Sequence, residues 1–418
     1  MPTPKQSCES RSPNPALLFL VSFFAFVALG GLSLWVSGHG YSDPAAVNLL
    51  NRSYDAAAGP ETLLRQIAWN YPQLPILLQA TASRIPAPHA NLPVNLLSAL
   101  CASCLVGWLY LEMCGVVGSR RAVFWTLLVA VHPFFLWAAT SSLVATLALS
   151  FFLVLAVAIL RIAHWADARS FLTFSFVLTL CMFNWDGGFL LFLLLLLFFP
   201  AFLPSEMRRS SIWAGYIAAF LIPVSAILCG FYMSWVFEKK LEAFSELQAG
   251  IIRTGSVAFI RSGHLYLFVI LLPLLSALMV LPPLLRLKQL SAIEKRALVI
   301  TLCIPSILLF TLSFRPAHPI ETLALFAALP AATLIRFLRE YQQVPAWGTF
   351  LLLASSLAGC ALVALFPFPE MQSCLAALSG RTTASSLYEV ASLVPWLVVA
   401  SALFAAAVGT AVLRRPNA

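Results

Sequence analysis

The sequence has very little charge. Asp, Glu, Lys and Arg make up 10% of its 418 residues, whereas a water-soluble domain carries roughly 25%. Apolar residues make up 61%, and the mean hydropathy is +0.91. So few charges cannot cover a folded surface in water, which excludes a soluble globular protein. The net charge of +9 does not indicate a nucleic-acid partner, because the basic residues stand in pairs at the ends of apolar runs, as in membrane proteins.

Motifs of several protein classes are also missing. The sequence has no GxxxxGK[ST] phosphate loop, which argues against a pump with its own ATPase motor. Its one CxxC, Cys101 and Cys104, lies inside an apolar run without a second pair. We interpret these cysteines as packing residues and not as a metal or redox site. The apolar run at 16–36 is expected to be a retained signal-anchor and not a cleaved signal peptide.

Long apolar runs fill most of the sequence. Because they are about 20 residues long and do not alternate with polar residues, they predict membrane-spanning helices and not barrel strands. The fold class is therefore an all-α polytopic membrane protein with about twelve transmembrane helices and with interface helices in the first outer loop. The predicted spans are 16–36, 92–117, 121–139, 142–161, 170–185, 187–204, 212–236, 264–284, 297–314, 319–337, 347–367 and 391–413.

The distribution of basic residues predicts the orientation. With the N-terminus inside, the inner segments hold 16 of the 25 Lys and Arg residues and the outer segments hold 9. This excess follows the positive-inside rule, so both termini are expected in the cytoplasm. The polar loops at 37–91, 239–262 and 368–390 then lie outside. Glu112, near the inner end of its span, is expected to snorkel or to form an ion pair.

The first outer loop is predicted to contain short helices. Asp43 and Pro44 are typical of a helix start, with an acid at the cap and proline in the first turn. We predict a helix at 44–50, a break at 55–59 and an amphipathic helix at 60–69 that lies in the membrane interface. Residues 73–85 are too short to span and are expected to lie in the interface or to re-enter the bilayer.

Asp43 is the main catalytic candidate. It lies a few residues beyond the membrane edge in a short, rigid segment, where a general base can reach a substrate whose tail lies in lipid. The alternative is a helix cap and nothing more. His39 lies four residues earlier, so a divalent metal between the two is an alternative, although two ligands do not complete a site. No cofactor is otherwise indicated, and no metal ligands are assigned.

Three arginines on the outer side are candidates for binding a phosphate. Arg52, Arg65 and Arg84 carry planar donors that suit a lipid phosphate. The alternative is pairing with Asp55 and Glu61, or with lipid headgroups.

Two further polar residues stand at predicted outer turns. Asp186, in NWDGG, and His132, in VHPFF, would face the same side as Asp43. Acids at membrane depth are costly and are often functional. The alternative is a capping role in each turn.

Several segments together resemble a known family. They are GYSDPAAV at 40–47, NYPQLPILLQ at 70–79, the stretch that begins HPFFLW at His132, FNWDGG at 183–188 and the outer loop at 237–262. Their order resembles the GT-C superfamily of polyprenyl-phosphate-sugar-dependent glycosyltransferases, especially protein O-mannosyltransferases and aminoarabinose transferases. Residues 1–260 would form the catalytic-type module, including the outer loop at 37–91, and residues 261–418 would add C-terminal transmembrane helices.

The resemblance implies a multi-pass enzyme of the bacterial inner membrane. It would move a sugar from a polyprenyl-phosphate donor to an envelope glycan, lipid or protein on the periplasmic face. Asp43 would deprotonate the acceptor hydroxyl, which attacks the anomeric carbon with inversion. The implied partners are the lipid-linked sugar, membrane lipids and a possible membrane protein, with no nucleic acid. The implied substrate-binding residues are Arg52, Arg65, Arg84, Asp55, Tyr71, His132 and Asp186.

Departures from the family pattern leave two alternatives open. The family usually has glutamate after the catalytic aspartate, whereas this sequence has Pro44, and SSLVATLALS at 141–150 carries no acid or arginine. Both departures fit a catalytically inactive scaffold subunit of an envelope complex. A secondary transporter fits twelve spans, but the halves 1–209 and 210–418 show no repeat.

Overall fold

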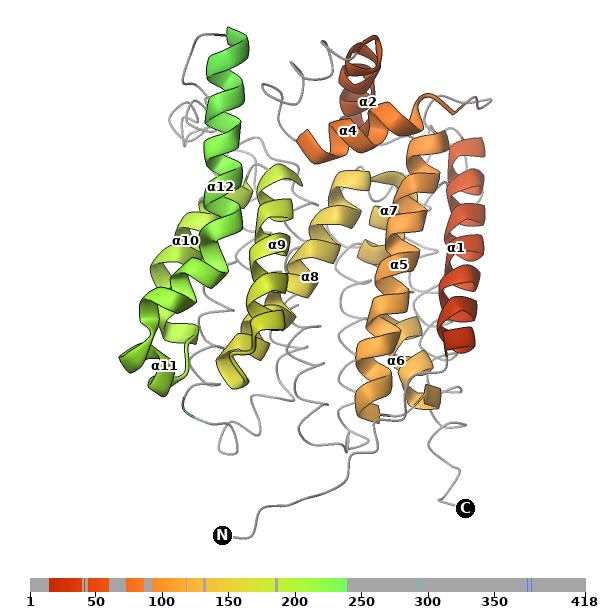
Figure 1. The fold of residues 1–418 in the computed structure, drawn as a ribbon. Helices are drawn as coiled ribbons and strands as arrows, with labels where there is room; N and C mark the ends of the chain where they lie inside the picture. The colour runs from red at the N-terminus through yellow and green to blue at the C-terminus, as the bar shows by residue number, and fades with distance from the viewer. Residues whose placement is uncertain are drawn as a thin grey trace, which may run out of the picture.

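The computed structural model describes residues 15–39, 41, 44–59, 73–85, 92–117, 119–130, 133–184 and 187–238, together with residues 292, 374 and 377. Within these residues every regular element is a helix, and there is no strand. Figure 1 shows most of the helices standing side by side, with two short ones lying across one end. The all-helical fold class is therefore confirmed for this part of the chain.

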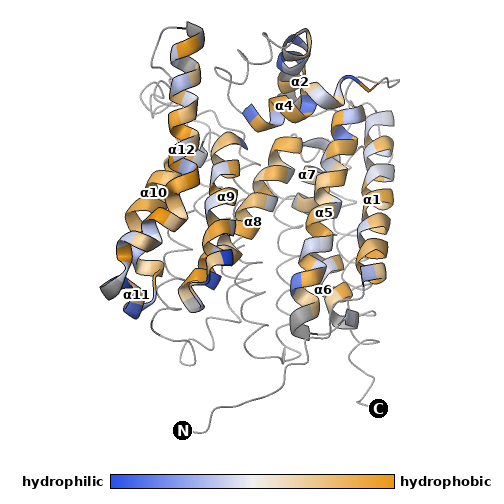
Figure 2. Cartoon of the chain, in the orientation of Figure 1, coloured by the Kyte–Doolittle hydropathy of each residue, from blue (hydrophilic) through white to orange (hydrophobic). Residues whose placement is uncertain are grey.

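Four of the described helices are long and apolar enough to cross a membrane. They are α1 (Pro15–Gly38), α5 (Leu92–Val117), α8 (Leu143–His164) and α12 (Ile212–Glu238). The apolar helices α9 (Ala168–Asn184) and α10 (Gly187–Phe202) are shorter and stand beside them. Figure 2 shows apolar residues along nearly the whole length of these upright helices. The protein is an integral membrane protein.

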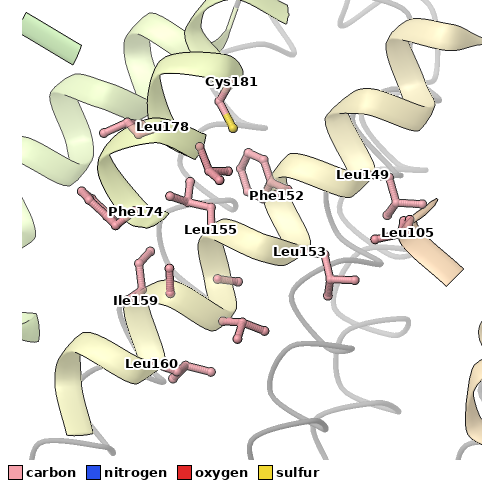
Figure 3. Close-up of a cluster of buried hydrophobic side chains, with 14 of the residues drawn as sticks. Leu105, Leu149, Phe152, Leu153, Leu155, Ile159, Leu160, Phe174, Leu178 and Cys181 are labelled. Atoms are coloured by element: carbon pink, nitrogen blue, oxygen red, sulfur yellow. The ribbon is translucent and has the colours of Figure 1, made fainter. Parts of the chain in front are cut away.

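The upright helices differ in how deeply they are buried. Within its most apolar stretch, α8 is 78% buried, whereas α1 is 17% buried. The α8 helix is therefore central and packs against α5 on one side and α9 on the other, while α1 packs on the outer side of α5. Figure 3 shows the α8–α9 contact, where Phe152 and Leu155 of α8 face Leu178 and Cys181 of α9.

An aromatic cluster joins α9 to the next two spans. The rings of Phe174, Phe199 and Phe220 come from α9, α10 and α12, with centroids 5.0 to 5.7 Å apart. Two of the three pairs are edge-to-face, which is a favoured arrangement for aromatic rings. This cluster places α10 and α12 on the far side of α9 from α8.

Gly188 allows α9 and α10 to approach closely. A Cβ atom at Gly188 would lie 2.6 Å from the Cα of Met182 and 2.7 Å from the carbonyl carbon of Cys181, and closer still to the Cys181 oxygen. Real Cβ atoms do not approach backbone so closely, so this position in NWDGG requires glycine. The short turn predicted between these two helices is thus made possible by one residue without a side chain.

Most predicted spans in the described part agree with the helices. The predictions at 16–36, 92–117, 142–161 and 212–236 correspond to α1, α5, α8 and α12, and those at 170–185 and 187–204 correspond to α9 and α10. The prediction of one helix at 121–139 was wrong, because the structure has α6 (Ser119–Ala130) and α7 (Pro133–Ser141). Proline lacks an N–H and disfavours helix in the residue before it, so Pro133 begins a new helix. The spans predicted from 264 onward lie outside the described residues.

The first predicted interface helix is longer than expected. It is α2 (Pro44–Ala57), so the break predicted at Asp55 was wrong. Leu49 and Leu50 bury one face of this helix, and no strong helix breaker occurs before Gly59 and Pro60. The second interface helix, predicted at 60–69, lies outside the described residues. Residues 73–85, which were predicted to be too short to span, contain the ten-residue helix α4 (Gln73–Ala82).

An ion pair joins α5 and α8 near the end of the bundle away from α2 and α4. Nη2 of Arg161 donates to both carboxylate oxygens of Glu112, with 2.6 Å to Oε2. The two side chains are only 21% and 13% exposed. The pairing predicted for Glu112 is confirmed.

We expect the Glu112→Gln variant to lower the free energy of unfolding by about 1–3 kcal/mol, because it leaves the Arg161 charge without its carboxylate. The loss is smaller than for a fully buried pair, since part of Arg161 reaches solvent. The double variant Glu112→Gln, Arg161→Gln should recover part of the lost stability, because it no longer has an unpaired charge. Thermal unfolding in nanodiscs measures both effects, with the exposed Arg169→Gln as the control. A Glu112→Gln variant as stable as the wild type would contradict this role.

Candidate functional site

Two short helices cover one end of the bundle, and we call α2 and α4 together the cap. Leu49 of α2 packs with Ile76 and Ala80 of α4, and Val144 at the start of α8 contacts this cluster. Leu50 of α2 is buried with residues of α5 and α8. Figure 1 shows the cap lying across the bundle where α5 and α8 begin and where α1 ends. The segment after the first span therefore returns onto the bundle.

The cap carries three of the predicted site residues. Arg52 is half-buried on α2, Asp55 is exposed on the same helix, and Arg84 is exposed in the turn that follows α4. The structure thus brings the two arginines and Asp55 to the same end of the bundle. The other predicted site residues lie outside the described residues: Asp43, Arg65, Tyr71, His132 and Asp186.

The described residues on either side of Asp43 belong to this end of the bundle. Two residues before it, Tyr41 is buried, and its hydroxyl accepts a hydrogen bond of 3.2 Å from Nε1 of Trp137 on α7. Directly after it, α2 begins at Pro44. His39 follows the end of α1, where its Nδ1 donates to the carbonyl of Trp35 over 2.8 Å. The junction between α1 and the cap is thus fixed to α7 by a side-chain hydrogen bond.

Beneath the cap lies a layer of uncharged polar side chains that the sequence analysis did not single out. Asn95 of α5 donates to Ser37 of α1 over 3.1 Å. Ser98 of α5 donates to the Ala138 carbonyl and shares a hydrogen bond with Thr146 of α8, both at 3.0 Å. A single Ser, Thr or Asn in an apolar run does not indicate a site. Four of them near the outer ends of the predicted spans, as here, would have been a signal in the sequence of a polar layer at that end of the bundle.

A residue of the C-terminal part of the chain reaches the same region. Sγ of Cys374 lies 3.9 Å from the hydroxyl of Thr140 near the end of α7, and both residues are fully buried. Cys374 belongs to the predicted outer loop at 368–390. The contact places this residue beside the end of α7 that leads directly into α8.

The chain matches no protein-family model, no curated protein and no solved structure. The chemistry of the site is therefore derived from its own residues. Arginine at a membrane interface suits an anionic lipid headgroup, and a layer of hydroxyls and amides suits a neutral polar group. Among the described residues, no three His, Cys, Asp or Glu side chains gather as a metal site would need.

Proposed function

We propose that this chain is a membrane glycosyltransferase of the GT-C type. It transfers a sugar from a polyprenyl-phosphate donor to an acceptor hydroxyl on an envelope glycan, lipid or protein. The observation that carries the proposal is the position of the cap. A segment that directly follows the first span lies over the end of the bundle and presents Arg52 and Arg84 where a lipid phosphate would sit.

The arrangement of basic residues supports an outer location for this site. Of the eight Lys and Arg residues in the described part, two belong to the cap region and six belong to helix ends away from it. The six are Arg120, Arg121, Arg161, Arg169, Arg208 and Arg209. By the positive-inside rule the end with six would face the cytoplasm, which supports our proposal that the cap faces the periplasm of a bacterial inner membrane.

The proposed reaction uses residues of the first outer loop. The Asp43 carboxylate takes the proton of the acceptor hydroxyl, and the acceptor oxygen attacks the anomeric carbon from the side opposite the phosphate. The bond between that carbon and the phosphate oxygen breaks, with inversion. The polyprenyl phosphate leaves with the bonding electrons, and the guanidinium groups of Arg52 and Arg84 stabilise its charge.

We expect the double variant Arg52→Ala, Arg84→Ala to bind polyprenyl phosphate at least about tenfold more weakly than the wild type, because each charge-assisted hydrogen bond contributes about 1.5–3 kcal/mol. Native mass spectrometry of the full chain in nanodiscs, titrated with polyprenyl phosphate, measures the affinity. Arg169→Ala is the matched control, since Arg169 is an exposed arginine at the opposite end of the bundle.

An equal loss in the Arg169→Ala control would mean that the lipid is attracted by charge in general and would contradict a phosphate site at the cap. A wild-type chain that binds no polyprenyl phosphate would contradict the transferase itself. It would favour the inactive scaffold, which fits Pro44 in place of the second acid, or the transporter.

A further inference from the structure

Two buried side-chain amides at the contact between cap and bundle have hydrogen-bonding atoms that no described residue satisfies. Gln79 of α4 and Asn184 at the end of α9 are both fully buried. Neither amide atom of Gln79 has a hydrogen-bond partner within the described part of the chain, and the same holds for Oδ1 of Asn184. Burying such groups is unfavourable unless they gain a partner. These unsatisfied atoms therefore point to a ligand.

Gln79 lies in the middle of the buried face of α4. The buried residues of this helix are Pro75, Ile76, Gln79, Ala80 and Ala82. With 3.6 residues per turn, Ile76 and Ala80 lie on one side of Gln79, and Pro75 and Ala82 lie on the other. On this face, Ile76 and Ala80 belong to the cluster that Val144 of α8 packs against. The Gln79 amide is thus directed toward the bundle and not toward solvent.

Val144 connects the two amides. Its side chain contacts the cluster that contains Ile76 and Ala80, which flank Gln79. Its carbonyl oxygen accepts a hydrogen bond of 3.3 Å from Nδ2 of Asn184. Both amides therefore adjoin the first turn of α8, directly beneath the cap.

On these two amides the unsatisfied atoms are one donor group and two acceptors, since Gln79 offers Nε2 and Oε1 and Asn184 offers Oδ1. A phosphate carries acceptors, so it would bring negative oxygens against two carbonyl oxygens. An ammonium group carries donors alone and leaves Nε2 unmatched. A hydroxyl both donates and accepts, so adjacent hydroxyls match the full set. None of the buried side chains in the described part is Asp, Glu, Lys or Arg, so they provide no counter-charge for an ionised sugar.

We propose that Gln79 and Asn184 bind the hydroxyl groups of a neutral sugar. This inference rests on the proposed function, because the lipid-linked donor delivers the sugar to this place. The arginines of the cap hold the phosphate, and the buried amides beneath it discriminate a sugar-bearing lipid from the bare lipid phosphate. Gln79 and Asn184 therefore determine specificity and do not take part in proton transfer.

The test compares two lipids on one protein. Polyprenyl-phosphate hexose and polyprenyl phosphate are titrated separately into the full chain in nanodiscs and measured by native mass spectrometry. We expect the wild type to bind the hexose-bearing lipid about tenfold more tightly than polyprenyl phosphate. One or two additional hydrogen bonds to the sugar account for a difference of this size. The Gln79→Leu and Gln79→Met variants should lose this preference and keep the affinity for polyprenyl phosphate.

A second measurement separates binding from a structural role. Without lipid, Gln79→Leu should melt at a higher temperature than the wild type, because an apolar side chain replaces a buried amide that lacks a partner. A glutamine that holds the fold together would give the opposite change. Thr81→Val is the matched control on the same helix, since Thr81 is exposed and should alter neither the preference nor the melting temperature by much.

The outcomes are distinguishable. If the Gln79 variants keep the preference for the hexose-bearing lipid, or if Gln79→Leu melts at a lower temperature, the sugar-binding role is overturned while phosphate binding leaves the transferase proposal standing. A wild type that binds both lipids equally also overturns it. If the wild type binds neither lipid, both proposals fail.

Discussion

The Asp43→Asn variant is expected to transfer sugar about 10²–10⁴-fold more slowly than the wild type, because an amide cannot accept the proton of the acceptor hydroxyl. Asparagine keeps the size of the side chain and its ability to cap a helix, so the chain should still fold and still bind polyprenyl phosphate. The measurement is release of polyprenyl phosphate from a polyprenyl-phosphate sugar, with membrane extract of the source cells as the acceptor pool.

The matched control is Asp167→Asn. Asp167 is an exposed acid at the opposite end of the bundle, and its Oδ1 accepts from the backbone N–H of Ser170 over 3.3 Å. Asparagine preserves that cap as well, so turnover should be unchanged. If Asp43→Asn retained full turnover, Asp43 would be a helix cap alone. The scaffold alternative predicts that Asp43→Asn also leaves the function of the chain within its complex unchanged.

The Gly188→Ala variant is expected to lower the free energy of unfolding by about 3 kcal/mol, at the upper end of the usual range for overpacking. The new methyl group would overlap backbone atoms of Cys181 and Met182, and backbone cannot move aside as a side chain can. The helices α9 and α10 would have to separate, which also disturbs the aromatic cluster of Phe174, Phe199 and Phe220. Thermal unfolding and the yield of folded chain measure the effect.

Gly31→Ala provides the control for this substitution. Gly31 lies inside α1, and an added Cβ would meet nothing within 4 Å. Alanine is a better helix former than glycine by about 1 kcal/mol, so Gly31→Ala should be neutral or slightly stabilising. Equal melting temperatures for the Gly188→Ala variant and the wild type would contradict the close approach of α9 and α10.

The spans could be predicted from sequence because apolar length alone determines them. A run such as 143–164 has no stable place outside lipid or protein, whatever its neighbours are. The division between α6 and α7 was missed because Pro133 lies within an apolar run, and hydropathy does not register its missing N–H. The length of α2 was missed because its last turn is held by packing, with Ala57 against the cluster of Leu49, Ile76 and Ala80, and this contact with α4 forms only in the folded protein.

The charged part of the site was accessible to sequence reasoning, and its neutral part was not. Arg52, Asp55 and Arg84 stand out because charge is rare in this chain, and the structure brings them to one end of the bundle. Gln79 is the last residue of the NYPQLPILLQ segment, yet nothing in the sequence marks it as buried. Its significance depends on Val144 and Asn184, which come from two other helices and meet α4 only in the folded protein.

The position of the lipid phosphate tests the central proposal most directly. Polyprenyl phosphate with a photoreactive diazirine next to its phosphate can be crosslinked to the full chain in nanodiscs, and the modified peptides can be mapped by mass spectrometry. We expect adducts in α2, α4 and the adjoining first turns of α5 and α8. Adducts concentrated at the opposite end, around α11 (Ser205–Ser210), or spread evenly over the lipid-facing helices would contradict a donor site beneath the cap.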